Sequence, residues 1–145
     1  MLKTIKEIGM NEFQEEKSLE GKKFRQIMQS HFDEKTFKFI NKESETWFKQ
    51  TIYPRSYSMH RCTPMDKLIY ITAMRLSGSC IAYVGDSPSD ANALSAANVG
   101  FAMKQSGCAM TEYHAHITIL DDNFSSVKSS LIWGRQIFDN ARRFI

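Results

Sequence analysis

The second half of the chain alternates between short apolar runs and helical segments. Residues 80–84, Cys-Ile-Ala-Tyr-Val, form a continuous apolar run that ends in Gly85-Asp86. Such a run, closed by turn residues, is typical of a buried parallel strand. Strands that alternate with helices at this spacing predict an α/β fold with a mostly parallel sheet. The predicted elements of this half are a strand at 80–84, a helix from Ser89 or Asp90 to Ala97, strands at 99–103 and 117–120, and a helix that starts after residues 121–123.

The first third of the chain is predicted to be helical. Apolar residues recur at helical spacing over residues 2–8. A second helical run begins at Gly21, with Phe24 and Met28 on one face. Residues 32–50 mix aromatic with charged side chains and are also predicted as helix, with an insertion packed on the surface as the alternative.

A helix with a clear start is predicted at residues 64–76, after a short strand at 55–61. Thr63 can cap this helix, and Pro64 suits its first position. Asp66 lies three residues after the cap, which is the spacing of a capping box.

Composition argues against several classes of function. The net charge of +3 is small, and no run of Lys and Arg with interleaved aromatic residues indicates nucleic-acid binding. No stretch of about 20 apolar residues predicts a membrane span. Cys62, Cys80 and Cys108 form no C-x-x-C pair and no zinc spacing with the histidines, which predicts reduced thiols in a cytosol-like compartment. Cys80 is expected to start the buried strand.

Asp86 and Asp90 are the carboxylates best placed to bind a ligand. Asp86 follows the strand at 80–84, and Asp90 lies four residues on, at a helix start. Ligands of parallel α/β folds bind at this edge, and two carboxylates there could hold Mg²⁺. Lys67, at the start of the preceding helix, could reach the same edge and neutralise phosphate oxygens. Spacing alone leaves open an ordinary Gly-Asp turn with a capping aspartate, and capping also explains Asp121-Asp122 better than a metal does.

Several segments resemble P-type ATPases, and the similarity extends over nearly the whole chain, being strong from residue 61 on and weak between residues 30 and 55. The stretch 119–127, Ile-Leu-Asp-Asp-Asn-Phe-Ser-Ser-Val, with 133–135, is most similar to calcium pumps of the plasma-membrane type. The other matches are 61–67 (Arg-x-x-Pro-x-x-Lys in the family), 84–94 (Thr-Gly-Asp-Gly-x-Asn-Asp-x-Pro-Ala-Leu), 98–103 (Asp-Val-Gly-Phe-Ala-Met), 5–10 and 20–25.

The resemblance implies a haloacid-dehalogenase-like, Rossmann-like fold. Residues 1–145 would form one partial phosphorylation domain, with a helical, variable part at 1–55 and a motif-bearing α/β part at 56–145. The family's nucleophile stands in an Asp-Lys-Thr-Gly-Thr motif that these residues do not contain. Its strand would lie in the middle of the sheet. The expected fold is therefore an incomplete, mostly parallel sheet with flanking helices that lacks the nucleophile strand.

The resemblance also implies roles for three residues. In the family, the position of Asp86 binds Mg²⁺, the position of Asp90 supports that site, and the position of Lys67 contacts the phosphoryl group. Ser87 stands where the family has Gly, and Ser89 where it has Asn, which argues against preserved catalysis. We therefore expect a protein without enzyme activity and without a required cofactor. Asp86 and Asp90 would be a vestigial Mg²⁺ site, and Lys67 a vestigial phosphate contact.

These expectations give two main hypotheses for function. In the first, the chain is a catalytically inactive remnant of a calcium-transporting ATPase phosphorylation domain and acts as a structural or interaction subunit. A protein partner would then cover the sheet edge near 80–84, on the cytosolic or organelle-matrix side, and would link the chain to a membrane complex. In the second, it is a fragment or split half of a functional pump. A small Mg²⁺-dependent phosphatase of the same fold would also need the missing aspartate.

Overall fold

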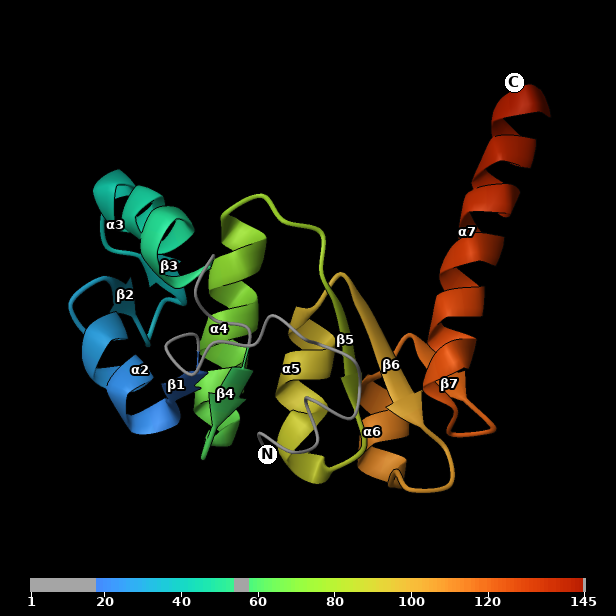
Figure 1. The fold of residues 1–145 in the computed structure, drawn as a ribbon, viewed down its shortest axis with the longest axis horizontal. Coiled ribbons are helices and arrows are strands. Elements are labelled where there is room, and N and C mark those ends of the chain that lie inside the picture. The colour runs from blue at the N-terminus through green and yellow to red at the C-terminus, as the bar shows by residue number, and fades with distance from the viewer. Residues whose placement is uncertain (1–17, 54–57, 145) are drawn as a thin grey trace. The chain divides into compact units, whose positions relative to one another are not determined.

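The computed structural model describes residues 18–53 and 58–144, which form two compact units that divide after Cys80 (Figure 1). The helix predicted at 2–8 and the first part of the strand predicted at 55–61 lie outside the described residues. Each unit contains its own buried cluster of apolar side chains, so each is described by itself.

The first unit combines short strands with helices. Its elements are β1 (Ser18–Glu20), α2 (Gly21–Met28), β2 (Phe32–Asp33), β3 (Lys38–Phe39), α3 (Lys42–Trp47), the π-helical η2 (Phe48–Ile52), β4 (Ser58–His60) and α4 (Pro64–Leu76). Strands β1 and β4 pair in parallel, with Leu19 opposite Met59. Strands β2 and β3 pair antiparallel, with Phe32 opposite Phe39.

The prediction of helix throughout residues 32–50 is wrong, because its first part forms a hairpin. The Asp33 carboxylate accepts a hydrogen bond from the backbone N–H two residues on, at 2.9 Å, which closes a turn. Phe37 has a φ of 52°, a left-handed conformation that no helix accommodates. The rings of Phe32 and Phe39 meet edge to face across the strand pair, 5.5 Å apart.

The core of the first unit is built on aromatic residues. Phe24 and Met28 of α2 are buried on one face of that helix, as the sequence predicts. The Tyr70 ring lies edge-on to Phe24 at 5.9 Å and to Phe48 at 6.2 Å, so that α2, η2 and α4 share one core. The buried cluster consists of Phe24, Met28, Phe32, Phe48, Ile52, Ile69 and Ala73.

Helix α4 begins and ends where the sequence predicts. Thr63 and Asp66 form the capping box: the Asp66 carboxylate accepts from the Thr63 N–H at 2.7 Å, and the Thr63 hydroxyl accepts from the Asp66 N–H at 3.4 Å. Arg25 of α2 donates to the same carboxylate at 2.5 Å and to the Thr63 hydroxyl at 3.0 Å. This ion pair fastens α2 to the N-terminus of α4.

The second unit is a three-stranded parallel sheet with helical connections (Figure 1). Its elements are β5 (Ala82–Gly85), the 3₁₀ turn η3 (Pro88–Asp90), α5 (Ala91–Ala96), β6 (Val99–Met103), α6 (Ala109–His114), β7 (Ile117–Ile119) and α7 (Phe124–Phe144). The strand order is β5-β6-β7, with Val84 opposite Phe101 and Ala102 opposite Thr118. The prediction of an α/β fold with a mostly parallel sheet is therefore confirmed.

The strand predicted at 80–84 is displaced by two residues at its start. Cys80 is exposed, so the expectation that it starts a buried strand is wrong. The carbonyl of Ile81 already pairs with the Val99 N–H at 3.1 Å, but the Ile81 N–H donates to the Asn98 side chain at 2.9 Å. A side chain therefore satisfies the backbone where regular strand pairing ends.

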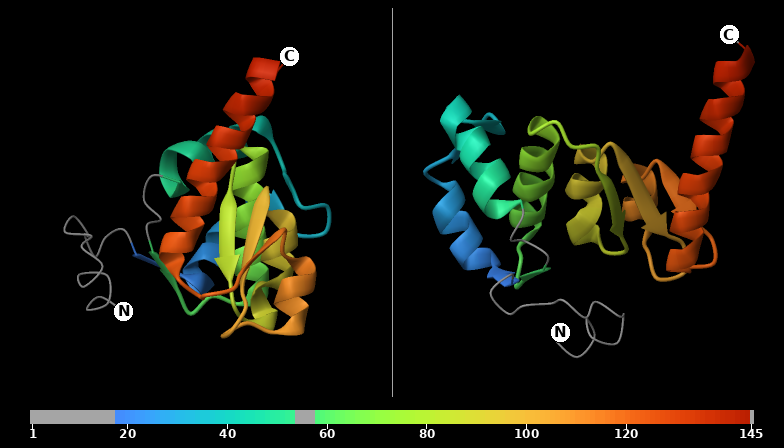
Figure 2. Two further views of the ribbon diagram at one scale, coloured as in Figure 1. Left: turned by 90° about the vertical axis from the view of Figure 1, so that its right-hand side faces the viewer. Right: turned by 45° about the horizontal axis from the view of Figure 1, so that its top comes forward.

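Helix α7 touches the core of its unit only near its start. Val127 packs with Phe101 and Ile119, whereas all residues from 131 to 144 are exposed. Both views in Figure 2 show α7 continuing beyond the strands of its unit. Within the described ranges, no helix combines the length and apolar character that crossing a bilayer requires.

Candidate functional site

Asp86 lies where the sequence predicts, directly after the C-terminal end of β5. Its side chain is exposed and has no hydrogen bond or ion pair with another described residue. It therefore presents one accessible carboxylate at the edge where parallel strands end and where ligands of such sheets bind.

Asp90 is enclosed by donors from its own loop and strand. It is only 5% exposed. One carboxylate oxygen accepts from the Tyr83 hydroxyl at 2.6 Å, and the other accepts from the Ser87 hydroxyl at 2.8 Å and the Ser87 N–H at 3.4 Å. The hydroxyls of Ser87 and Ser89 lie 2.6 Å apart. These charge-assisted hydrogen bonds compensate the cost of burying the carboxylate.

The turn between β5 and Asp90 brings Asp90 so close to position 85 that only glycine fits there. A Cβ on Gly85 would lie 2.7 Å from the Asp90 Cβ. Glycine at this position therefore lets Asp90 fold back beneath the end of the strand, where Tyr83 and Ser87 reach it.

The fit of Mg²⁺ to these residues is poor. Both oxygens of Asp90 accept hydrogen bonds, and Asp86 alone is accessible. Mg²⁺ demands near-octahedral oxygen coordination and is held in proteins by carboxylates together with waters and phosphates. In the part of the chain that the structure describes, no group of three or more His, Cys, Asp and Glu side chains could hold a metal ion. Asp86 and Asp90 do not by themselves fit the ion, and the predicted Mg²⁺ site stays a prediction.

Lys67 lies in the other unit from the two aspartates. It is half-buried in the first turn of α4, one residue after the capping Asp66. The prediction that Lys67 contacts a phosphoryl group at the edge marked by Asp86 stays a prediction.

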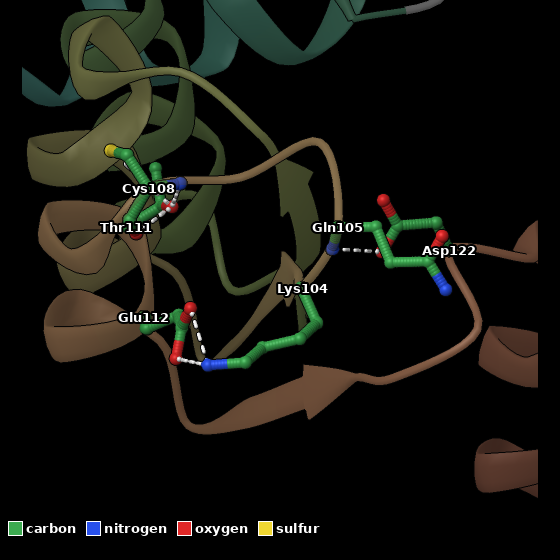
Figure 3. A network of polar contacts seen from close by, with 6 residues as sticks. All are labelled: Lys104, Gln105, Cys108, Thr111, Glu112 and Asp122. Atoms are coloured by element: carbon green, nitrogen blue, oxygen red, sulfur yellow. Dashed lines mark hydrogen bonds and ion pairs between the residues drawn. The ribbon is translucent and has the colours of Figure 1, made fainter.

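A polar network joins the loops that follow β6 and β7 (Figure 3). The Asp122 carboxylate accepts from the backbone N–H groups of Gln105 at 2.9 Å and Ser106 at 2.5 Å. Partial desolvation opposes ionisation, but these N–H groups hold the pKa of Asp122 below its ordinary value. The assignment of Asp122 to helix capping is therefore wrong, because its carboxylate ties two loops together.

Asp121 and Asn123 stabilise the start of α7 instead. Asp121 accepts from the Ser126 hydroxyl at 2.7 Å and from the Asn123 N–H at 3.2 Å, and these bonds lower its pKa. The Asn123 side chain accepts from the Ser125 N–H at 2.9 Å. Asn123 is therefore the residue whose side chain caps α7, whereas Asp121 accepts from a side chain of the first turn and from the N–H of Asn123. The prediction that Asp121 caps the helix is wrong.

The same region contains the cysteine with the more acidic thiol. Thr111 hydrogen-bonds to Cys108 through its backbone and its side chain, which lowers the pKa of the Cys108 thiol (Figure 3). Burial raises the pKa of Cys62. Lys104 bridges both carboxylate oxygens of Glu112, at 2.9 and 2.7 Å, beside Cys108. In the sequence, the position of Cys108 directly before a short helix is the only sign that its thiol is more acidic than that of Cys62.

Among known proteins, the chain is similar to calcium-transporting ATPases. Calcium-transporting ATPase 2 of Schizosaccharomyces pombe is 34% identical over 128 residues, which cover 88% of this chain and 9% of that protein. Putative calcium-transporting ATPase 13, plasma membrane-type, of Arabidopsis thaliana is 34% identical over 135 residues, covering 93% and 12%. Calcium-transporting ATPase 12, plasma membrane-type, of Arabidopsis thaliana is 41% identical over 87 residues, covering 60% and 8%. No family model matches the chain.

A solved structure of the catalytic domain of the CPx-ATPase CopB-B superposes with a TM-score of 0.46 and 24% identity, over 61% of this chain and 34% of that one. The sequence relatives place the chain among P-type ATPases, and it is similar to one segment of these proteins. More particularly, it is related to calcium-transporting ATPases that include plasma-membrane-type members, which confirms the resemblance seen in the sequence. The chain spans 9%, 8% and 12% of the length of these three relatives.

Proposed function

We propose that this chain is a non-catalytic relative of the calcium-pump phosphorylation domain and acts as a structural or interaction subunit of a larger, membrane-associated assembly. The closed environment of Asp90 carries the proposal. The resemblance assigns this position to the support of a Mg²⁺ site, but here Ser87 replaces a glycine and donates its hydroxyl to Asp90. Tyr83 occupies the other oxygen. The carboxylate is thus used within the fold.

The lack of a recognisable nucleophile supports the same proposal. Covalent phosphoryl transfer needs an aspartate that attacks the phosphorus. The 145 residues contain no Asp-Lys-Thr-Gly-Thr motif, so the reaction would need a nucleophile from other residues. Asp86 and Lys67 are retained, but without that nucleophile these two charged residues do not make a complete reaction centre.

Hydrolysis assays test the absence of catalysis. The purified full chain should hydrolyse neither ATP nor p-nitrophenyl phosphate above the buffer rate with millimolar Mg²⁺, and Asp86→Asn should leave this baseline unchanged. Asp139→Asn, which removes an exposed carboxylate of α7, is the matched control. Turnover that Asp86→Asn abolishes and Asp139→Asn preserves would overturn the proposal.

The position of β5 supports the interaction role. β5 lies at one end of the described sheet, with β6 on one side. Backbone groups of alternate residues in a parallel strand point to opposite sides, and the Ile81 carbonyl points to β6. The N–H and C=O groups of Ala82 and Val84 therefore point away from β6. We infer that an extended segment of a partner protein pairs with this edge by strand addition.

A pump segment is the second candidate function, favoured by the similarity to calcium pumps over 93% of the chain and by the accessibility of Asp86. In that case the nucleophile, the nucleotide site and the membrane helices come from residues outside this chain. The native assembly would then include a polypeptide that carries Asp-Lys-Thr-Gly-Thr and becomes labelled by γ-³²P-ATP. Under the first proposal, the isolated assembly forms no phosphoenzyme.

A further inference from the structure

The four histidines of the chain all lie in the described ranges, and each forms a hydrogen bond through Nδ1. Three of them bond a serine hydroxyl: His60 with Ser18 at 3.1 Å, His31 with Ser44 at 3.3 Å and His114 with Ser95 at 2.8 Å. His116 differs, because its Nδ1 accepts from the backbone N–H of Gly100 at 2.9 Å. One histidine of the four is therefore bonded to a group that can only donate.

A hydroxyl and a backbone N–H respond differently when the ring takes up a proton. A serine hydroxyl can donate or accept, so it can turn and accept from a protonated Nδ1. A backbone N–H has no acceptor, so Nδ1 of His116 must carry no proton as long as its bond exists. Histidine is the side chain whose charge changes between about pH 5 and pH 8. Acid therefore breaks the bond of His116, whereas the three serine bonds can persist.

The bond between His116 and Gly100 lies at the start of the β6–β7 pairing. Regular pairing begins with Phe101 opposite Ile117. One residue earlier, the carbonyl of Gly100 accepts from the backbone N–H of His116 at 2.8 Å. The N–H of Gly100 points to the same side, where the imidazole takes the place of a strand partner. Gly100 is buried, so its N–H would be an unpaired buried donor once the ring is protonated.

The charges around His116 do not compensate for that loss. Helix α5 and strands β6 and β7 contain no titratable side chain. The titratable groups of the remaining neighbours are Glu112, Tyr113 and His114 on α6, Lys128 in the first two turns of α7, and Asp121 and Asp122 after the far end of β7. Glu112 pairs with Lys104 at 2.7 Å. No carboxylate of the described residues forms an ion pair with His116 that would hold a proton on its ring.

We propose that His116 is an acid-sensitive latch that holds the start of β7 against β6. The neutral ring closes the pairing at Gly100, and a proton taken from the solvent onto Nδ1 opens it. The side chain of His116 is exposed, so protons reach it without unfolding of the unit. Opening loosens the segment that joins α6 to β7 and frees the backbone of Ile117, whose side chain is 41% exposed. The inference does not depend on whether the chain has catalytic activity.

Nuclear magnetic resonance of the full chain tests the latch directly. At about pH 7.5, a scalar coupling across the hydrogen bond should join the amide nitrogen of Gly100 to Nδ1 of His116, and at about pH 5.5 it should disappear. The protection factor of the Gly100 amide, which corrects hydrogen exchange for the intrinsic effect of pH, should fall about fivefold over the same range, the effect of one lost hydrogen bond.

Two asparagine variants separate the latch from a general effect of acid. His116→Asn keeps an acceptor that does not titrate, so the Gly100 protection factor should be equal at both pH values. His114→Asn removes a titrating ring from the same region and should keep the wild-type response. A pH-independent protection factor in the wild type, or no coupling to Nδ1 at about pH 7.5, would overturn the proposal. A response that persists in His116→Asn or is lost in His114→Asn would overturn it as well.

Discussion

Asp122 combines a left-handed backbone with a carboxylate that receives two backbone N–H groups. Its φ of 48° is a conformation that aspartate and asparagine tolerate better than most residues. The N–H groups of Gln105 and Ser106 stabilise the charged form, so the pKa of Asp122 in the folded chain lies below the value of 3.8 for an unperturbed aspartate. Ionised Asp122 therefore stabilises the fold at any pH above 3.8, and this contribution disappears as the pH falls through the folded pKa.

Asp122→Asn should consequently destabilise the chain at neutral pH, with a difference from the wild type that shrinks once the pH falls below 3.8. Asparagine tolerates the left-handed backbone, so the loss reports the charge. Urea unfolding at a series of pH values measures it, with Asp139→Asn on the exposed part of α7 as the control. A destabilisation that persists unchanged in acid would contradict the assignment.

At the scale of the elements, β5 is an edge strand of its described sheet. Ala82 is exposed, and its N–H points away from β6 because strand pairing alternates. Proline at position 82 would remove the N–H that points away from β6 and would leave the backbone N–H and C=O groups that pair with β6 unchanged. Edge strands tolerate proline in this orientation.

Ala82→Pro should therefore abolish the proposed strand addition, whereas Ala82→Val should preserve it, because valine keeps the N–H and favours extended backbone. Affinity purification of the tagged full chain under native conditions, compared among the three proteins, measures partner retention. Hydrogen exchange in β6 checks that the sheet is intact. Recovery of the same partner with Ala82→Pro as with the wild type would rule out pairing at this edge.

Sequence reasoning succeeded for elements with local signals. The helix at 64–76 and the strand at 99–103 have the predicted bounds, because a capping box with proline and a bounded apolar run each specify an element locally. The prediction for residues 32–50 was wrong because a segment of helix-like composition forms a hairpin in its first part. A hydrogen bond to the Asp33 carboxylate and a positive φ at Phe37 close that hairpin. Those determinants are backbone geometries, which side-chain periodicity does not encode.

The candidate site was predictable in position but not in chemistry. The end of the strand and its Gly-Asp turn place Asp86 correctly. The enclosure of Asp90 depends on Tyr83, whose hydroxyl reaches the carboxylate because the turn folds Asp90 back beneath the strand. The two partners lie seven positions apart on different elements, a strand and a 3₁₀ turn, so neither helical nor strand periodicity predicts their contact. The contact of Asp122 with the loop after β6 is not local either.

At the scale of the whole molecule, the chain consists of two units with separate cores. The first unit contains the fully buried Asp66. One oxygen of its carboxylate accepts hydrogen bonds from the Thr63 N–H and the Arg25 guanidinium. Its other oxygen has no hydrogen-bond partner in the described structure. A Cβ on Gly21 would lie 2.8 Å from the paired oxygen, so the carboxylate is also tightly enclosed.

Arg25→Met should destabilise the first unit by about 3 kcal/mol, because it leaves a buried carboxylate without its cation. Hydrogen exchange should rise in α2 and α4, while β6 in the second unit should keep its wild-type protection, since the two cores are separate. Lys22→Met, which removes an exposed charge from the same helix, is the control and should change neither region. An equal rise of exchange in β6 would mean that the chain unfolds as one cooperative body.

The order β5-β6-β7 has a consequence for synthesis. Each new strand pairs with the one just before it in the chain, after a connection that includes one short helix. Because loop closure is cheap for such near neighbours, the sheet can grow strand by strand as the polypeptide leaves the ribosome. β5 is thus the first strand of this sheet to be synthesised. In a nascent chain, its backbone groups on the side away from β6 would be accessible to other molecules before translation ends.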